Sequence, residues 1–136
     1  NTLAPQTNFY DSTAPIIDYK NIPEELKEKL MISTVVSYFS PAFTWYIRKP
    51  DYVIPFSLNG IGEDQVSYNN SKGQIVDKYS GSPILVEKPN EDFYLAVDSF
   101  ALSKLKTNQR AFLDELTKDC QVEHNTNSGR IYYCKN

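Results

Sequence analysis

Histidine is nearly absent from this sequence, and the common signatures of catalysis and metal binding are absent with it. The single histidine, His124, leaves the Ser/His/Asp and Cys/His arrangements with one candidate base and excludes metal sites built from several histidines. The chain also contains no phosphate-binding loop, dinucleotide-binding glycine motif, nucleophile elbow or zinc-ligand spacing. We therefore predict no catalytic residues, no metal site and no cofactor.

A surplus of basic charge is also lacking, as is any long apolar run. There are 14 Lys and Arg residues against 17 Asp and Glu residues, a formal net charge of −3, so nucleic-acid binding is not expected. No apolar run reaches the ~18 to 20 residues that a membrane span needs. Because the chain begins at Asn1 without an initiator Met, we expect a processed or trimmed product from which an N-terminal segment has been removed.

What is present suits one globular domain spanning residues 1–136. The composition is 40% hydrophobic, 23% charged and 13% aromatic, which is too apolar for a disordered chain and too mixed for a fibrous one. A chain of 136 residues buries roughly two-thirds of its unfolded surface when it folds. The sequence therefore predicts a single domain with one hydrophobic core.

The two cysteines, Cys120 and Cys134, both lie close to the C-terminus. In an oxidising compartment they would close a loop over residues 121–133, with a stabilisation on the order of 3 kcal/mol. The alternative is two unrelated buried thiols. We favour the disulfide, and a disulfide indicates export from the cytosol.

The first half of the chain is predicted to contain one helix and several irregular segments. Pro23 suits a first helical turn, Glu24 complements the positive end of the helix dipole, and Leu26 and Leu30 share one face. These features predict a helix over residues 23–38. The other elements expected here are an irregular lead-in over 1–21, a short strand over 44–48 and an exposed loop over 59–73.

The second half is predicted to alternate strands with one long helix. Phe93, Leu95 and Val97 alternate with more polar positions, which is typical of a strand with one buried face. Apolar residues from Leu102 to Cys120 recur at helical spacing. The expected elements are strands over 74–78, 84–87 and 93–99, the last two forming an antiparallel hairpin, then a helix over 102–120 and terminal strands over 121–124 and 131–135. The fold class is therefore α+β, with an antiparallel β-sheet covered by helices.

Three groups of residues are candidates for function. His124 fits an exposed position better than a catalytic base, because the sequence places no nucleophile beside it. The carboxylates Asp114, Glu115 and Asp119 fit a solvated helix face better than a paired acid and base. The clustered aromatic residues offer a partner-binding surface, with core packing as the alternative. They are Trp45, Tyr46, Tyr52 and Phe56.

The order of these motifs resembles that of type IVb pilins without their hydrophobic N-terminal helix. The matching segments are 21–26 (NIPEEL), 74–86 (QIVDKYSGSPILV), 93–97 (FYLAV) and the helix ending at Cys120. The sequence departs from the family in its long aromatic, proline-rich stretch over 40–60, in lacking Trp-Gly-Gly at 79–81, and in the close spacing of its cysteines. Major pilin, minor pilin and pseudopilin therefore all stay open.

The resemblance implies a pilin-like domain that is a structural subunit of an extracellular, cell-surface filament rather than an enzyme. Its expected partners are other pilin subunits and a host or surface receptor in cell adhesion. Contact with a membrane is expected only through a missing N-terminal helix. The alternatives are a small secreted or periplasmic protein-binding domain of the inhibitor or immunity type, and a small hydrolase that uses His124 or a carboxylate pair.

Overall fold

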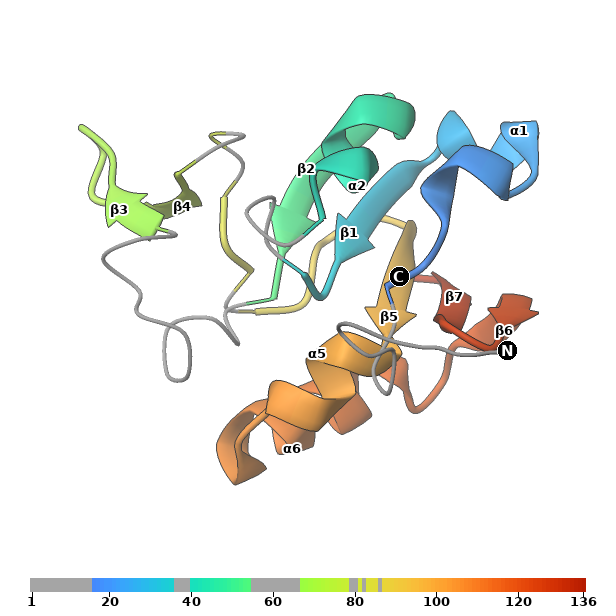
Figure 1. The fold of residues 1–136 in the computed structure, drawn as a ribbon. Helices are drawn as coiled ribbons and strands as arrows, with labels where there is room; N and C mark the ends of the chain where they lie inside the picture. Colours follow the sequence, from blue (N-terminus) through green and yellow to red (C-terminus); the bar gives the residue numbers. More distant parts are fainter. Residues whose placement is uncertain (1–15, 36–39, 55–66, 79–80, 82, 86) are drawn as a thin grey trace.

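The computed structural model describes residues 16–35, 40–54, 67–78, 81, 83–85 and 87–136 (Figure 1). It has helices and strands in a mixed order, which confirms the α+β class. The elements are η1 (Tyr19–Asn21), α1 (Glu24–Lys27), β1 (Leu30–Ser33), α2 (Pro41–Tyr46), β2 (Lys49–Val53), β3 (Ser67–Asn69), β4 (Ile75–Asp77), β5 (Phe93–Asp98), α5 (Ser99–Lys104), α6 (Thr107–Thr117), β6 (Gln121–Thr126) and β7 (Gly129–Cys134).

The main sheet has five strands in the order β2-β1-β5-β7-β6. The strands β2, β1 and β5 run parallel, whereas β7 is antiparallel to both β5 and β6. The expectation of an antiparallel sheet is therefore wrong for half of it. The reason is that β1 is covered on both faces, as parallel strands usually are, and its apolar run has no polar alternation that would mark it as a strand.

Residues 23–38 do not form the expected single helix. A single turn, α1, ends at Lys27, and the chain then enters β1. Within this range, residues 36–39 lie outside the described part. The branched side chain of Ile32 loses less freedom in a strand than in a helix, and in β1 it is fully buried. Tertiary burial thus outweighs the helical spacing of Leu26 and Leu30.

Three further expectations need correction. Residues 44–48 are mostly helical rather than a strand, because α2 begins with Pro41 at its first position. Strand β5 pairs with β1 and β7, and not with the described residues of the segment 84–87, where Ile84 instead forms an isolated parallel bridge with Val53. The expected helix over 102–120 is two helices, α5 and α6, because Leu105 adopts an extended backbone between them.

Other expectations are confirmed or lie partly outside the described residues. The terminal hairpin is present as β6 and β7, and β4 falls within the expected strand over 74–78. The expected loop over 59–73 contains β3, which pairs with β4 in a separate two-stranded sheet. Residues 59–66 of that loop, and residues 1–15 of the lead-in, lie outside the described part.

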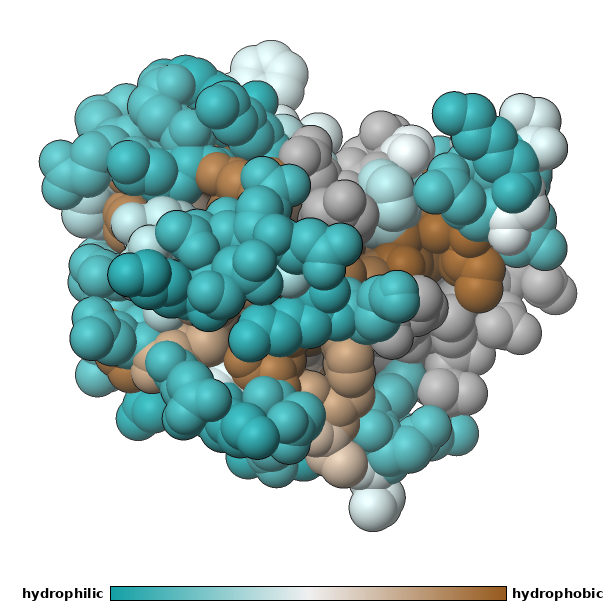
Figure 2. All heavy atoms as spheres, turned by 180° about the vertical axis from the view of Figure 1, so that it is seen from behind, coloured by the Kyte–Doolittle hydropathy of each residue, from teal (hydrophilic) through white to brown (hydrophobic). Residues whose placement is uncertain are grey.

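Both faces of the main sheet carry a hydrophobic core. The first, which we call the N-terminal core, packs η1, α1 and α2 on the sheet; the second, the C-terminal core, packs α6 on the other face (Figure 1). Seen from behind, most of the coloured surface is hydrophilic, with apolar residues in small patches (Figure 2). The N-terminal core comprises Ile17, Tyr19, Ile22, Leu26, Met31, Phe43, Ile47, Ala96 and Ile131. The C-terminal core comprises Ile32, Ile54, Leu85, Phe93, Leu95, Val97, Leu113, Leu116 and Cys134.

Candidate functional site

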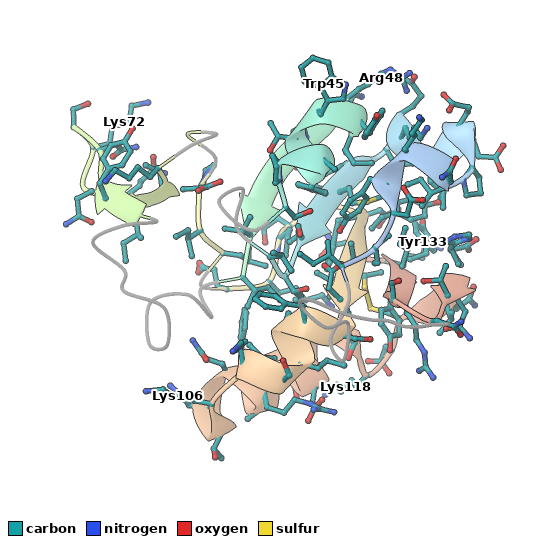
Figure 3. All side chains as sticks on the ribbon, viewed as in Figure 1. Trp45, Arg48, Lys72, Lys106, Lys118 and Tyr133 are labelled. Carbon is teal, nitrogen blue, oxygen red and sulfur yellow. A yellow bond between two sulfur atoms is a disulfide. The ribbon has the colours of Figure 1, made fainter. Side chains whose placement is uncertain are left out.

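Trp45 is the most exposed of the large hydrophobic residues that the structure describes, with 81% of its surface accessible. It lies on α2, near Arg48, which follows the helix (Figure 3). Phe43 and Ile47, four positions apart, point into the N-terminal core, and Trp45 lies between them in sequence and so on the opposite side of the helical turn. The exposure of Trp45 therefore follows from the way α2 packs.

Ion pairs join Arg48, which follows α2, to α1 and to Glu28, the residue that caps its C-terminus. The Arg48 guanidinium lies 2.6 Å from the carboxylate of Glu28 and 3.6 Å from that of Glu24. The ammonium of Lys27, which is only 4% exposed, donates to Glu24 at 2.6 Å and to the carbonyl of Lys20 at 2.7 Å. The hydrogen bond from Lys27 and its charge hold the pKa of the Glu24 carboxyl below its usual value. We call Trp45, Arg48, Glu24 and Glu28 the Trp45 surface.

The remaining predicted partner-binding residues do not extend this surface within the described part. Tyr46 is half-buried against the N-terminal core, and the Lys27 ammonium lies 5.5 Å from its ring centroid. Tyr52 lies on β2 opposite Ile32, and its side chain lies outside the described part. Phe56 also lies outside it. The structure thus places Trp45 in solvent and Tyr46 partly in the core.

The predicted disulfide is confirmed, and the alternative of two unrelated thiols is wrong. The sulfurs of Cys120 and Cys134 are bonded at 2.10 Å. Cys120 follows α6, and Cys134 ends β7, where it is almost fully buried. The bond therefore ties the end of the helix that covers the sheet to a strand within the sheet.

A buried carboxyl, Asp98, was missed by the sequence analysis as a polar centre of the fold. It lies at the end of β5 and accepts hydrogen bonds from the backbone of Ile17 at 2.5 Å and from the hydroxyls of Tyr19 and Thr34 at 3.4 Å. Burial raises the pKa of Asp98 to about 7, although these hydrogen bonds act in the opposite direction. The signal available in the sequence was a polar residue at the end of an apolar strand. It could not show that Asp98 is buried and hydrogen-bonded, because the donors come from segments far away in the sequence.

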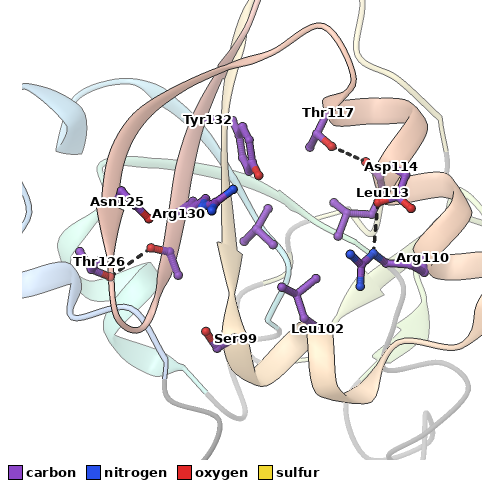
Figure 4. A pocket seen from close by; sticks show the side chains of 12 residues that line it. Ser99, Leu102, Arg110, Leu113, Asp114, Thr117, Asn125, Thr126, Arg130 and Tyr132 are labelled. Atoms are coloured by element: carbon purple, nitrogen blue, oxygen red, sulfur yellow. Dashed lines mark hydrogen bonds and ion pairs between the residues drawn. The ribbon is translucent and has the colours of Figure 1, made fainter.

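A cavity of about 400 Å³ separates α6 from the β6–β7 hairpin (Figure 4). Arg110 and Asp114 line it from α6, while Arg130 and Tyr132 line it from β7. The Arg110 Nε atom lies 3.1 Å from a carboxylate oxygen of Asp114. His124 is not among the lining residues, although it is on β6.

The other candidate carboxylates lie elsewhere. Glu115 and Asp119 line a separate hollow of about 230 Å³ that also contains three lysines. One of these, Lys118, lies 2.8 Å from the Glu115 carboxylate. The structure therefore separates Asp114 from Glu115 and Asp119, and it does not bring His124 to either hollow.

In the described ranges, no group of three or more His, Cys, Asp or Glu side chains gathers in a way that could hold a metal ion. No helix in those ranges is both long and apolar enough to cross a membrane. Comparison of the chain with protein-family models, with curated proteins and with solved structures finds no match.

Proposed function

We propose that this domain is a structural subunit of an extracellular type IV pilus or pilus-like filament. The disulfide between Cys120 and Cys134 is the observation that supports this most, because such bonds form and persist outside the cytosol. It closes the C-terminal part of the domain, as in the family that the sequence resembles. A covalent closure also suits a subunit that must stay folded on the cell surface.

The Trp45 surface is proposed as a contact with a neighbouring subunit. Trp and Arg are the residues most enriched among those that dominate binding energy at protein interfaces. Trp45 is held on a short helix whose other side packs into the N-terminal core, and Arg48 is held by Glu24 and Glu28. A side chain presented by a packed element loses little conformational freedom on binding, which favours affinity.

The test uses the full-length gene in its native cell, with antibodies against this domain. We expect immunogold label along surface filaments, and we expect the protein in the fraction that shearing releases from cells. A Trp45→Ala variant should fold normally and be depleted from that fraction. The matched control is Tyr68→Ala, which removes another exposed aromatic side chain, half accessible and on β3.

Label confined to a soluble periplasmic or cytosolic fraction, with no filament stained, would reject the filament proposal. Equal depletion of the Trp45→Ala and Tyr68→Ala variants would instead reject the Trp45 surface as the contact between subunits.

The second candidate function is a secreted or periplasmic domain that binds one partner protein. The same exposed Trp45 favours it, because a single aromatic side chain on a polar surface can anchor a complex with one partner protein, as in a domain of the inhibitor or immunity type. In this case the native protein should co-purify with a partner at fixed stoichiometry, Trp45→Ala should break that complex, and no filament should carry the label.

A further inference from the structure

We propose that the cavity between α6 and the β6–β7 hairpin binds a small hydroxylated carboxylate, that is, an acidic sugar. The proposal concerns ligand binding by this cavity and does not depend on filament assembly. It rests on the charge of the cavity, on its mixture of polar and apolar walls, and on the way its walls are held.

The cavity has a net positive charge, because among the described residues one of its two arginines is neutralised by a carboxylate and the other is not. The Arg110–Asp114 pair, with atoms 3.1 Å apart, is neutral as a unit. Arg130 forms no side-chain hydrogen bond or ion pair with any residue in the described part, and its guanidinium points from β7 into the cavity (Figure 4). A guanidinium with its donors unused matches the geometry of a carboxylate, which it can bind through two parallel hydrogen bonds.

The walls carry the groups that a sugar requires. Hydroxyl and amide side chains line the cavity from three elements, α5, α6 and β6, and the ring of Tyr132 lies near Arg130 (Figure 4). Leu102 and Leu113 form an apolar wall from the helices. A sugar ring presents hydroxyls at its rim and C–H groups on its faces, so it can use both kinds of wall. The polar lining residues are Ser99, Thr117, Asn125 and Thr126.

Two polar groups of the lining are already oriented by the protein. The Thr117 hydroxyl donates to the carbonyl of Leu113 at 3.0 Å, and the Thr126 hydroxyl donates to the carbonyl of Gly129 at 3.1 Å. The Thr117 oxygen is therefore left as an acceptor, whereas the Thr126 oxygen already accepts from the amide of Ser128 at 3.1 Å and keeps one lone pair. Such acceptors suit the hydroxyl donors of a sugar more than a simple anion. The cavity volume of about 400 Å³ lies within the range of small-molecule sites.

The two walls are also fixed relative to each other. The disulfide joins the end of α6 to β7, and the amide of Ser99 donates to the carbonyl of Ser128 at 2.9 Å, which ties α5 to the tip of the hairpin. Walls held in this way need little ordering when a ligand binds, and less ordering leaves more of the contact energy as affinity.

The test is an NMR titration of the oxidised full chain with galacturonate, and with galactose, acetate and inorganic phosphate as separate probes. We expect galacturonate to give saturable shifts in the amides of α6, β6 and β7. Galactose lacks the carboxylate, whereas acetate and phosphate lack the sugar ring, so each should bind about tenfold more weakly or worse.

Two variants assign the binding to Arg130. Arg130→Gln should weaken galacturonate binding about tenfold, and Arg130→Lys should lie between it and the native protein because it keeps the charge and loses the two-pronged donor. Arg48→Gln is the matched control, since it removes an exposed arginine of the Trp45 surface. The amide spectrum of each variant without ligand shows whether the variant is folded. If Arg130→Gln does not fold, the galacturonate affinity of Arg130→Lys tests the role of Arg130 instead.

Four results would overturn the proposal. They are an absence of saturable shifts with galacturonate, equal binding of acetate or phosphate, equal binding of galactose, and unchanged galacturonate affinity in both folded Arg130 variants. Equal binding of acetate or phosphate would reduce the cavity to a non-selective anion site. Shifts confined to residues outside α6, β6 and β7 would also contradict the assigned location.

Discussion

At the scale of single residues, Asp98 is a fully buried carboxyl whose pKa is raised by that burial. Its carboxyl lies at the end of β5 with Tyr19 from η1 and Thr34 from the segment after β1 packed around it. Burial raises the pKa of Tyr19 as well, so the phenol stays protonated and can keep donating to Asp98. Asp98 thus joins three distant segments through hydrogen bonds while resisting ionisation.

Replacing Asp98 by Asn should remove a pH dependence of stability. A carboxyl whose pKa rises from 3.8 to about 7 on folding binds its proton more tightly in the folded state. The native protein should therefore lose stability, on the order of 4 kcal/mol, as the pH rises from about 4 to about 7. Asp98→Asn keeps an acceptor for Ile17 and cannot ionise, so its free energy of unfolding should be nearly flat over that range.

Urea denaturation at several pH values measures this effect, with Asp92→Asn as the control. The pKa of the exposed Asp92 carboxyl is lowered, chiefly by the hydrogen bond from the backbone of Asn136. Asp92 therefore contributes stability above its unfolded pKa that disappears as the pH falls through its folded pKa, the opposite sign to Asp98. Parallel pH profiles for the native protein and Asp98→Asn would contradict the prediction.

Gly129, the first residue of β7, should tolerate no side chain. Its φ is +152°, and a Cβ atom there would lie 2.9 Å from the Cα of Asp98 and 3.0 Å from a side-chain carbon of Ile17. Gly129→Ala should therefore lower the free energy of unfolding by about 2 to 4 kcal/mol. Gly73→Ala is the control, because Gly73 has a φ of +77° but nothing within 4 Å, and it should cost about 1 kcal/mol. Equal denaturant midpoints for the two variants would reject this reading.

At the scale of elements, the terminal hairpin is held by two different means. Strand β7 is hydrogen-bonded on both sides, to β5 and to β6, while the disulfide ties its last residue to the end of α6. Among the residues that the structure describes, strand β6 pairs only with β7, and it is largely exposed. The position of β6 therefore depends on β7, and the disulfide limits how far both can move from α6.

Removing the disulfide should loosen this hairpin before the rest of the sheet. The double variant Cys120→Ser/Cys134→Ser should lose about 3 kcal/mol of stability, as expected for a sequence separation of 14 residues. Hydrogen exchange should quicken first in β6, then in β7, and last in β1, which lies between two strands. Adding a thiol reductant should change the native protein but not the variant. Uniform acceleration across the sheet would contradict the prediction.

At the scale of the whole molecule, the sheet is stable only if both faces are covered. The C-terminal core is closed by α6, which follows β5 closely in the chain. The N-terminal core depends instead on Ile17, Tyr19 and Ile22, which pack on strands that come later in the chain. The N-terminal segment is therefore a structural layer of the domain.

Deleting residues 1–22 should consequently disrupt the N-terminal core. Met31, Ala96 and Ile131 would lose their cover on that face. We expect weaker near-ultraviolet circular dichroism, binding of a hydrophobic dye and a less cooperative denaturation. Tyr19→Phe is a milder comparison, since it loses only the hydroxyl and keeps the aromatic ring, whose centroid lies 5.2 Å from that of the Phe43 ring. A truncated chain with the native denaturant midpoint would show that this layer is dispensable.

Local chemistry by itself determined the α+β class, the disulfide and the terminal hairpin. The disulfide could be predicted because Cys120 and Cys134 are the sole cysteines and lie close together in the sequence. The terminal hairpin could be predicted because its turn residues separate two short segments that are also close in sequence. The strand β5 was also predicted, because its alternation is local, but the expectation of one buried face is wrong: β5 is buried on both faces, with Ala96 in the N-terminal core and Leu95 in the C-terminal core. The sequence placed Trp45 in an aromatic cluster but did not show which members of the cluster are exposed, and the partner-binding role of these residues stays a prediction.

Only the tertiary structure decided the parallel half of the sheet, the exposure of Trp45, the buried site of Asp98 and the cavity between α6 and the β6–β7 hairpin. Strand β1 is a strand because β2 and β5 lie beside it, although α2 separates it from β2 and β5 comes much later in the chain. Asp98 meets Ile17 across 81 positions of sequence, and the cavity joins α6 to β7. Pairing between distant segments depends on the burial that the complete fold provides, and periodicity within a short window carries no information about it.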